Sequence, residues 1–157
     1  MSITRYKLEL YQLGTSLESE LKKIIKKHET QIIGMVKNRL YQTGRDGSGG
    51  LITPSYKQST INYKKEEGKR SAFVTLKDEG LFYAGFYVEL QDYVVVLNSS
   101  DGKTSSLLDK YGKEILEFTK EEQDYIVNNI IDYEIELLLT KAGLNASSAT
   151  GIELDLF

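Results

Sequence analysis

Residues 86–97 read FYVELQDYVVVL and carry the clearest β-strand signal of the chain. From residue 86 to residue 90, apolar side chains occupy every second position, which is the period of a strand with one buried face. Gln91-Asp92 breaks the pattern, and residues 93–97 are then apolar throughout, as in a strand covered on both faces. These features predict an antiparallel hairpin over about residues 83–98, although its turn lacks the usual glycine.

A long amphipathic helix is expected before the hairpin, over about residues 16–42. Its apolar residues recur with the 3.6-residue period of a helix that packs along one face. Thr15 and Glu18 have the spacing of a capping box at its start, and Gly44 is a natural stop at its end. We therefore expect this helix to be packed along its whole length.

A second long helix is expected after the hairpin, over about residues 120–141, with a capping box of Thr119 and Glu122 at its start. Its main apolar stripe is predicted to consist of Ile126, Ile130, Tyr133 and Leu137. The latter part of this helix is apolar nearly all round, which indicates burial on more than one side. A second protein is one candidate for the additional cover.

Shorter elements complete the predicted fold. Thr53 and Pro54 match an N-cap followed by proline at the first helical position, which predicts a short helix over residues 54–64. Another short helix is expected at residues 105–111, and a short strand at residues 114–118. The predicted fold class is therefore α+β: a small antiparallel sheet packed by two long helices.

Two segments are expected to lie outside this packed core. Residues 44–50 (GRDGSGG) contain four glycines in seven positions, which predicts a flexible loop or hinge. Residues 145–151 (NASSATG) resemble a linker, and residues 152–156 (IELDL) alternate apolar and acidic residues before the segment ends at Phe157. We therefore expect one domain over residues 1–144, followed by a linker and an extended C-terminal arm. The arm could pair with its own sheet or add a strand to a neighbour's sheet edge, and the sequence leaves both open.

The composition of the 157-residue chain argues against several kinds of chemistry. It has no cysteine, which excludes disulfides, thiolate metal sites and cysteine nucleophiles, and its single histidine is His28. No apolar run approaches a membrane span, and the polar N-terminus lacks the apolar core of a signal peptide. The net charge of −3 divides into +4 over residues 1–100 and −7 over residues 101–157. This division suits head-to-tail contact between copies, or two solvated faces.

Three segments resemble motifs of phage virion morphogenesis proteins, which are small head–tail connector, neck and tail-completion proteins. Residues 74–86 (VTLKDEGLFYAGF) resemble the turn L-x-D-T-G-x-L of that family, with Glu79 in place of its usual threonine. Residues 47–63 are similar to its flexible segment and P-x-Y-x-x-x-T stretch, and residues 107–118 (LLDKYGKEILEF) to its L-x-x-x-Y-G-x-x-I-x-x-L segment. The order of elements is alike over about residues 15–142, and the likeness extends to versions in phages of gut Bacteroidetes, including crAss-like phages.

The resemblance implies a structural, non-enzymatic protein of the virion, assembled in the cytoplasm of the host bacterium. Copies would form a homo-oligomeric ring at the head–tail junction, bridge the portal and other neck or tail proteins, and leave a channel for DNA. No cofactor, metal ion or membrane partner is expected. One alternative is a small nucleic-acid-binding phage accessory protein. Another is an enzyme, which would need carboxylates such as Asp46, Asp78 and Glu79 to converge in a pocket.

The candidate interface residues belong to the glycine-rich loop, the tyrosines near the hairpin, the last helix and the arm. They are Gly44, Asp46, Gly47, Gly49, Gly50, Tyr83, Tyr87, Ile131, Leu138, Leu139, Ile152, Leu154, Leu156 and Phe157. Tyrosine suits an interface because it offers a large contact area and a hydroxyl at low entropic cost. A basic cluster is the candidate contact for DNA in the channel or for an acidic partner. It consists of Lys64, Lys65, Lys69 and Arg70.

Overall fold

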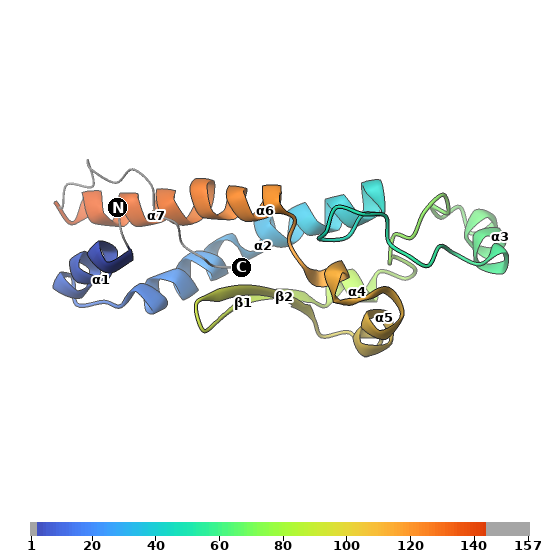
Figure 1. Cartoon of the computed structure of the whole chain (residues 1–157), viewed down its shortest axis with the longest axis horizontal. Coiled ribbons are helices and arrows are strands. Elements are labelled where there is room, and N and C mark those ends of the chain that lie inside the picture. Colours follow the sequence, from blue (N-terminus) through green and yellow to red (C-terminus); the bar gives the residue numbers. More distant parts are fainter. Residues whose placement is uncertain (1–2, 144–157) are drawn as a thin grey trace. The chain divides into compact units, whose positions relative to one another are not determined.

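The computed structural model describes residues 3–143 and has an α+β fold (Figure 1). The α-helices are α1 (Ile3–Gln12), α2 (Leu17–Thr43), α3 (Gln58–Glu66), α4 (Leu81–Ala84), α5 (Thr104–Tyr111), α6 (Lys120–Tyr125) and α7 (Asp132–Lys141). A 3₁₀ helix, η1 (Lys113–Leu116), and a π-helix, η2 (Ile126–Ile131), flank and interrupt the later helices. The strands β1 (Phe86–Gln91) and β2 (Val94–Ser99) form a two-stranded sheet. Within the described part of the chain, no helix is both long and apolar enough to cross a membrane.

The contacts of the chain divide it into two compact units. Unit 1 contains residues 1–29, 88–96 and 123–157, and unit 2 contains residues 30–87 and 97–122. Helix α2, the hairpin and helix α6 each contribute residues to both units. The chain therefore divides into two contact units, and neither is continuous in the sequence. The single domain over residues 1–144 stays a prediction.

The predicted α+β class, the hairpin and the two long helices are confirmed. The two-residue turn lies at Asp92-Tyr93, one position later than predicted, and both residues have positive φ angles, 48° and 64°. Positive angles at both central residues characterise the mirror-image turn that matches the twist of a hairpin. The expectation that the second strand is covered on both faces is wrong, because Val94 is 38% exposed and Val96 is half-buried.

Unit 1 has a core of aliphatic side chains from α1, α2, the hairpin and the last helix. Its buried apolar residues are Leu10, Leu17, Leu21, Ile24, Ile25, Val88, Leu90, Val95, Ile126, Ile130, Ile131, Ile135 and Leu139. On β1, the backbone N–H of Val88 donates to Oε1 of Glu29 on α2, at 3.0 Å. The pKa of Glu29 is lowered by hydrogen bonds from Lys26 and from this N–H.

The stripe predicted for the last helix is correct at Ile126 and Ile130 but wrong further along. Tyr133 is 59% exposed, whereas Ile131 and Ile135 are fully buried. The reason is the π-helical turn from Ile126 to Ile131, which places more residues in a turn than the 3.6 of an α-helix. The residues that follow this wide turn are therefore out of step with the α-helical period.

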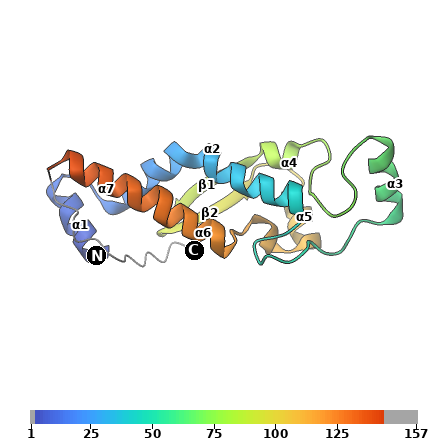
Figure 2. The same ribbon diagram turned by 90° about the horizontal axis from the view of Figure 1, so that it is seen from above.

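Unit 2 has a core of aliphatic and aromatic side chains around the second half of α2. Its buried apolar residues are Ile32, Ile33, Val36, Leu40, Ile52, Val74, Leu76, Phe82, Tyr83, Phe86, Leu97, Ile115, Leu116 and Phe118. The rings of Phe82 and Phe86 meet edge to face, with centroids 4.9 Å apart, a preferred aromatic geometry. Irregular loops join α3 to the rest of this unit on both sides (Figure 2).

Several local predictions need correction. The short helix predicted over residues 54–64 begins at Gln58, since Lys57 before it has an extended backbone. The Thr53-Pro54 peptide bond is cis. The strand predicted at residues 114–118 is instead the 3₁₀ helix η1, and helix α1 was not predicted at all.

The two predicted capping boxes have different outcomes. At the start of α2, Ser16 supplies the cap in place of Thr15, because its Oγ accepts from the N–H of Ser19 at 3.1 Å. At the start of α6 the predicted box is confirmed in both directions. The N–H of Thr119 donates to Glu122 Oε2 at 2.9 Å, and the N–H of Glu122 donates to Thr119 Oγ1 at 3.2 Å.

Candidate functional site

The glycine-rich loop of unit 2 is closed by hydrogen bonds, in contrast to the flexible loop that was predicted. Arg45 and Leu51 form an isolated antiparallel bridge that brings its two ends together. In the middle, the N–H of Gly47 donates to the carbonyl of Glu114 at 2.8 Å. A Cβ at Gly47 would lie 2.5 Å from the backbone oxygen of Glu117, so only glycine allows this approach. This loop is thus fastened to residues that follow α5.

A buried ion pair holds the same region from the side of α2. Arg39 Nε donates to Glu122 Oε1 at 2.8 Å, and the two side chains are only 11% and 10% exposed. The two other guanidinium nitrogens donate to the carbonyls of Arg45 and Glu117, each at 2.8 Å. Arg39 therefore ties the glycine-rich loop and the start of α6 to α2.

Three of the predicted interface side chains are buried by the chain itself. Ile131 and Leu139 have no exposed surface, and Tyr83 is 7% exposed with its hydroxyl donating to the carbonyl of Thr75. Burial raises the pKa of Tyr83. Tyr87 and Leu138 are half-buried. The arm residues Ile152, Leu154, Leu156 and Phe157 lie outside the described residues.

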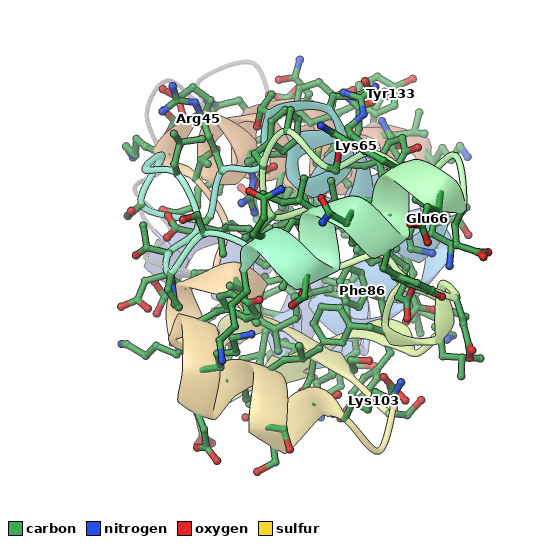
Figure 3. All side chains as sticks on the ribbon, turned by 90° about the vertical axis from the view of Figure 1, so that its right-hand side faces the viewer. Arg45, Lys65, Glu66, Phe86, Lys103 and Tyr133 are labelled. Atoms are coloured by element: carbon green, nitrogen blue, oxygen red, sulfur yellow. The ribbon has the colours of Figure 1, made fainter. Side chains whose placement is uncertain are left out.

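The basic residues predicted as one cluster have four different environments. Lys64 is 4% exposed, and its Nζ donates to the carbonyl of Lys77 at 2.8 Å. Lys69 forms an ion pair with a carboxylate, Arg70 stacks on the rings of two aromatic residues, and Lys65 is exposed. Lys65 lies on the outward surface of α3 in Figure 3. The structure therefore does not bring the four together as one cationic surface.

A cavity of about 240 Å³ lies beside Lys64 in unit 2 and is called the Lys64 cavity below. It is bounded by α3, by residues 76–82 and by residues 101–111. Its walls are mostly apolar and aromatic. The apolar and aromatic side chains of the lining are Tyr56, Tyr63, Leu76, Leu81, Phe82, Leu107 and Tyr111. Leu81 is 56% exposed and Tyr63 is 46% exposed, so apolar surface remains open to solvent here.

The charged residues of the Lys64 cavity are mixed in sign. The basic members are Lys64, Lys77 and Lys103, and the acidic members are Asp78, Glu79 and Asp101. Lys69, just outside, holds Asp78 at 2.9 Å, and this hydrogen bond is the largest cause that lowers the pKa of Asp78. Lys103 lies at the turn into α5 (Figure 3). Of the carboxylates in the enzyme alternative, Asp78 and Glu79 line the cavity, whereas Asp46 belongs to the glycine-rich loop.

A second group of charges lies in unit 1. Oε1 of Glu134 accepts from Lys27 Nζ at 2.6 Å and lies 2.7 Å from Nε2 of His28. Hydrogen bonds from Lys27 and then from His28 are the main causes of a lowered pKa at Glu134. Asp132 is the opposite case, since burial and then the nearby charge of Glu136 raise its pKa. Its Oδ1 is buried and has no hydrogen-bond partner among the described residues.

Lys64 was predicted to contact DNA or an acidic partner as part of a basic cluster, whereas Leu81 and Tyr111 were not predicted as site residues. A signal for Lys64 was present, because it follows Ile61 by three positions and Thr60 by four, which places it on their face of a helix. No comparable signal exists for Leu81 and Tyr111. They come together with Lys64 through the fold rather than through spacing in the sequence.

Comparisons of the chain with protein-family profiles, with curated proteins and with solved structures gave no match. The resemblance to phage virion morphogenesis proteins therefore stays a prediction that rests on three short motifs.

Proposed function

We propose that the protein is a structural, non-enzymatic component of a tailed-phage virion. In this proposal, copies form a ring at the head–tail junction that bridges the portal and the tail and leaves a channel for DNA. The proposal rests on the resemblance, and one observation supports it most. Glycines of two of the resembling motifs, Gly80 and Gly112, perform structural roles in the fold.

The turn motif around Gly80 is an example of such a structural role. Gly80 has a φ angle of 90°, a left-handed conformation that favours glycine, and it leads directly into α4. The next residues, Phe82 and Tyr83, are buried in the aromatic core of unit 2. The motif therefore supplies the left-handed residue that precedes α4 and anchors α4 by burial.

The Y-G motif has a similar role. Gly112 has a φ angle of 88° and follows the last residue of α5, Tyr111. Ile115 and Leu116 in the following 3₁₀ helix are buried. The order of long helix, glycine-rich loop, hairpin, Y-G segment and last helix is also the order that the resemblance implies.

Exposed apolar side chains give a reason for assembly. Leu51, Leu81 and Tyr133 are 55%, 56% and 59% exposed, respectively. Single exposed apolar residues are common on soluble proteins, but Leu81 adjoins the apolar wall of the Lys64 cavity. A neighbouring subunit that covered this wall would remove apolar surface from water.

The oligomeric state of the purified full chain tests the proposal. Mass photometry over a range of concentrations, followed by negative-stain electron microscopy, should show closed particles of uniform size. Shortening the chain after Asn145 should weaken assembly, whereas the linker variant A146S/A149S, which keeps the arm, should not. A monomer at every concentration that binds DNA tightly, with strong salt dependence, would instead support the nucleic-acid-binding alternative.

The position in the virion needs a separate measurement. Gold-labelled antibodies raised against the purified chain should decorate disrupted virions at the head–tail junction. Virions that lack the protein, or labelling restricted to another part of the particle, would contradict the proposal.

A further inference from the structure

Lys64 leaves part of its bonding capacity unused in the wall of the Lys64 cavity. An ammonium group has three donors. The described partners of Lys64 are the carbonyl of Lys77, at 2.8 Å, and the ring of Tyr56, whose centroid is 5.0 Å from Nζ. No carboxylate within the described residues lies at ion-pair distance from it. A buried cation without a close counter-ion is costly, so this wall favours a ligand that supplies an anionic group.

The nearby acids do not meet this need. Asp78, whose pKa Lys64 helps to lower from further away, is hydrogen-bonded to Lys69 at 2.9 Å. Glu79 is exposed, and Asp101 is half-buried near the start of α5. Lys77 and Lys103 balance these acids around the cavity. The unmatched charge is therefore the buried one at Lys64.

The remaining walls favour an apolar occupant. The side chains of Leu81, Phe82 and Leu107 line the cavity beside the tyrosine rings, and Leu81 is largely exposed. A volume of about 240 Å³ suits a short stretch of an extended peptide that enters between α3 and the other walls, so that both of its sides contact the protein. The matching ligand combines apolar side chains with a carboxylate next to them.

We propose that the segment Ile152–Phe157 of a second copy of this chain occupies the Lys64 cavity. The segment reads IELDLF, so Ile152, Leu154 and Leu156 alternate with Glu153 and Asp155, and Phe157 follows. Bound in extended form, it would direct its leucines to one side and its acids to the other, because successive side chains of a strand point in opposite directions. One side can then meet the apolar wall while the other offers a carboxylate to Lys64.

The length of chain beyond the described residues permits this contact between copies. Residues 144–151 separate α7 and its terminal glycine from the segment. At about 3.3 Å per residue, these eight residues can span roughly 26 Å when extended. This inference rests on the proposed function in one respect, since it names the contact by which copies of the chain recognise one another.

A peptide-binding experiment tests the site directly. The probe is a fluorescein-labelled peptide of residues 149–157, and the receptor is the full chain carrying I152S/L154S/L156S, so that its own arms do not compete. Fluorescence anisotropy should show saturable binding. Lys64→Met should weaken it by about tenfold or more, because the peptide carboxylate loses its partner. Lys65→Met, which removes an exposed lysine next to it, should leave binding unchanged.

Two further comparisons keep the result interpretable if Lys64→Met alters folding. Leu81→Asn should also weaken binding, whereas Leu51→Asn, at a position that is equally exposed, should not. A peptide with Gln and Asn in place of Glu153 and Asp155 should bind the unchanged cavity weakly. That peptide should lose no further affinity on Lys64→Met. Equal binding of the charged and uncharged peptides would overturn the role assigned to Lys64.

A mixing experiment tests whether the segment comes from another copy. One chain carries I152S/L154S/L156S with an intact cavity, and the other carries K64M/L81N with an intact segment. Neither should associate alone, and the mixture should form complexes by mass photometry. Peptide binding without such complexes would overturn the claim that the segment comes from another copy. Ring assembly that persists in a chain unable to bind peptide would overturn the inference but leave the proposed function standing.

Discussion

The ion pair between Arg39 and Glu122 gives the sharpest prediction for the stability of unit 2. Both side chains are about nine-tenths buried, so solvent screens their attraction little. Arg39→Met keeps the apolar stem but removes three hydrogen bonds and leaves the Glu122 carboxylate without its cation. Removal of one partner of a buried pair typically costs about 3–5 kcal/mol. For a chain of this length, that corresponds to a fall in Tm of roughly 6–20 °C.

The assay is urea unfolding followed by far-UV circular dichroism, with thermal unfolding as a second measurement. The matched control is Arg45→Met, because Arg45 is exposed and its side chain donates one hydrogen bond to the carbonyl of Gly49. We expect this control to cost about 1 kcal/mol or less. A cost for Arg39→Met that is no greater than that of Arg45→Met would refute the reasoning.

A double variant separates the cost of the unpaired buried charge from the contribution of the helix cap to stability. Glutamine at position 122 can still accept the N–H of Thr119, as in a capping box, but it carries no charge. We therefore expect R39M/E122Q to be more stable than R39M by about 1 kcal/mol or more, since the unpaired carboxylate is gone. If the double variant is instead less stable than R39M, the cost of Arg39→Met does not come from the buried charge.

Three further predictions concern single sites. Gly47→Ala should destabilise by about 1–3 kcal/mol, because its Cβ would overlap the backbone of Glu117, whereas Gly102→Ala has open space and should change Tm little in the same thermal unfolding experiment. Glu134 has a lowered pKa, so its contribution to stability is present above its ordinary value of 4.5 and is lost as the pH falls through the lowered pKa. Glu134→Gln should therefore reduce Tm near neutral pH and converge with the unmodified chain in acid. Asp132 has a raised pKa, so its charged form opposes folding once the pH rises above the ordinary value of 3.8 and through the raised pKa. Asp132→Asn should raise Tm near neutral pH, and this gain should disappear below pH 3.8; a constant gain at all pH values would show that charge is not its cause.

Local sequence patterns were sufficient for the secondary structure that dominates the fold. The hairpin follows from alternation around Val88, and the capping box at Thr119 gives the start of the last helix. The predicted apolar stripe of that helix was wrong beyond Ile130, because apolar residues are abundant on all sides of the helix. Ile135 is buried and Tyr133 is exposed because a π-helical turn precedes them, and the spacing of apolar residues does not reveal that turn.

Less of the candidate site could be predicted from the sequence, and the reason is physical. A run of lysines and glutamates indicates a solvated face, yet Lys64 turns inward because the fold places the carbonyl of Lys77 and the ring of Tyr56 around its ammonium. The prediction that the glycine-rich loop is flexible was wrong for a related reason. Glycines suggest freedom, but Gly47 is required here because the backbone of Glu117 comes so close.

The bond between Glu29 and Val88 restricts how this small sheet can grow. A strand at the border of a sheet offers open N–H groups that attract further strands, a common origin of unwanted aggregation. At Val88, a carboxylate already occupies the donor that an incoming strand would need. Because hydrogen bonds from Lys26 and Val88 lower the pKa of Glu29, this carboxylate stays ionised to a lower pH than an ordinary glutamate does. Extension of the sheet at this point of β1 therefore requires that Glu29 first be displaced.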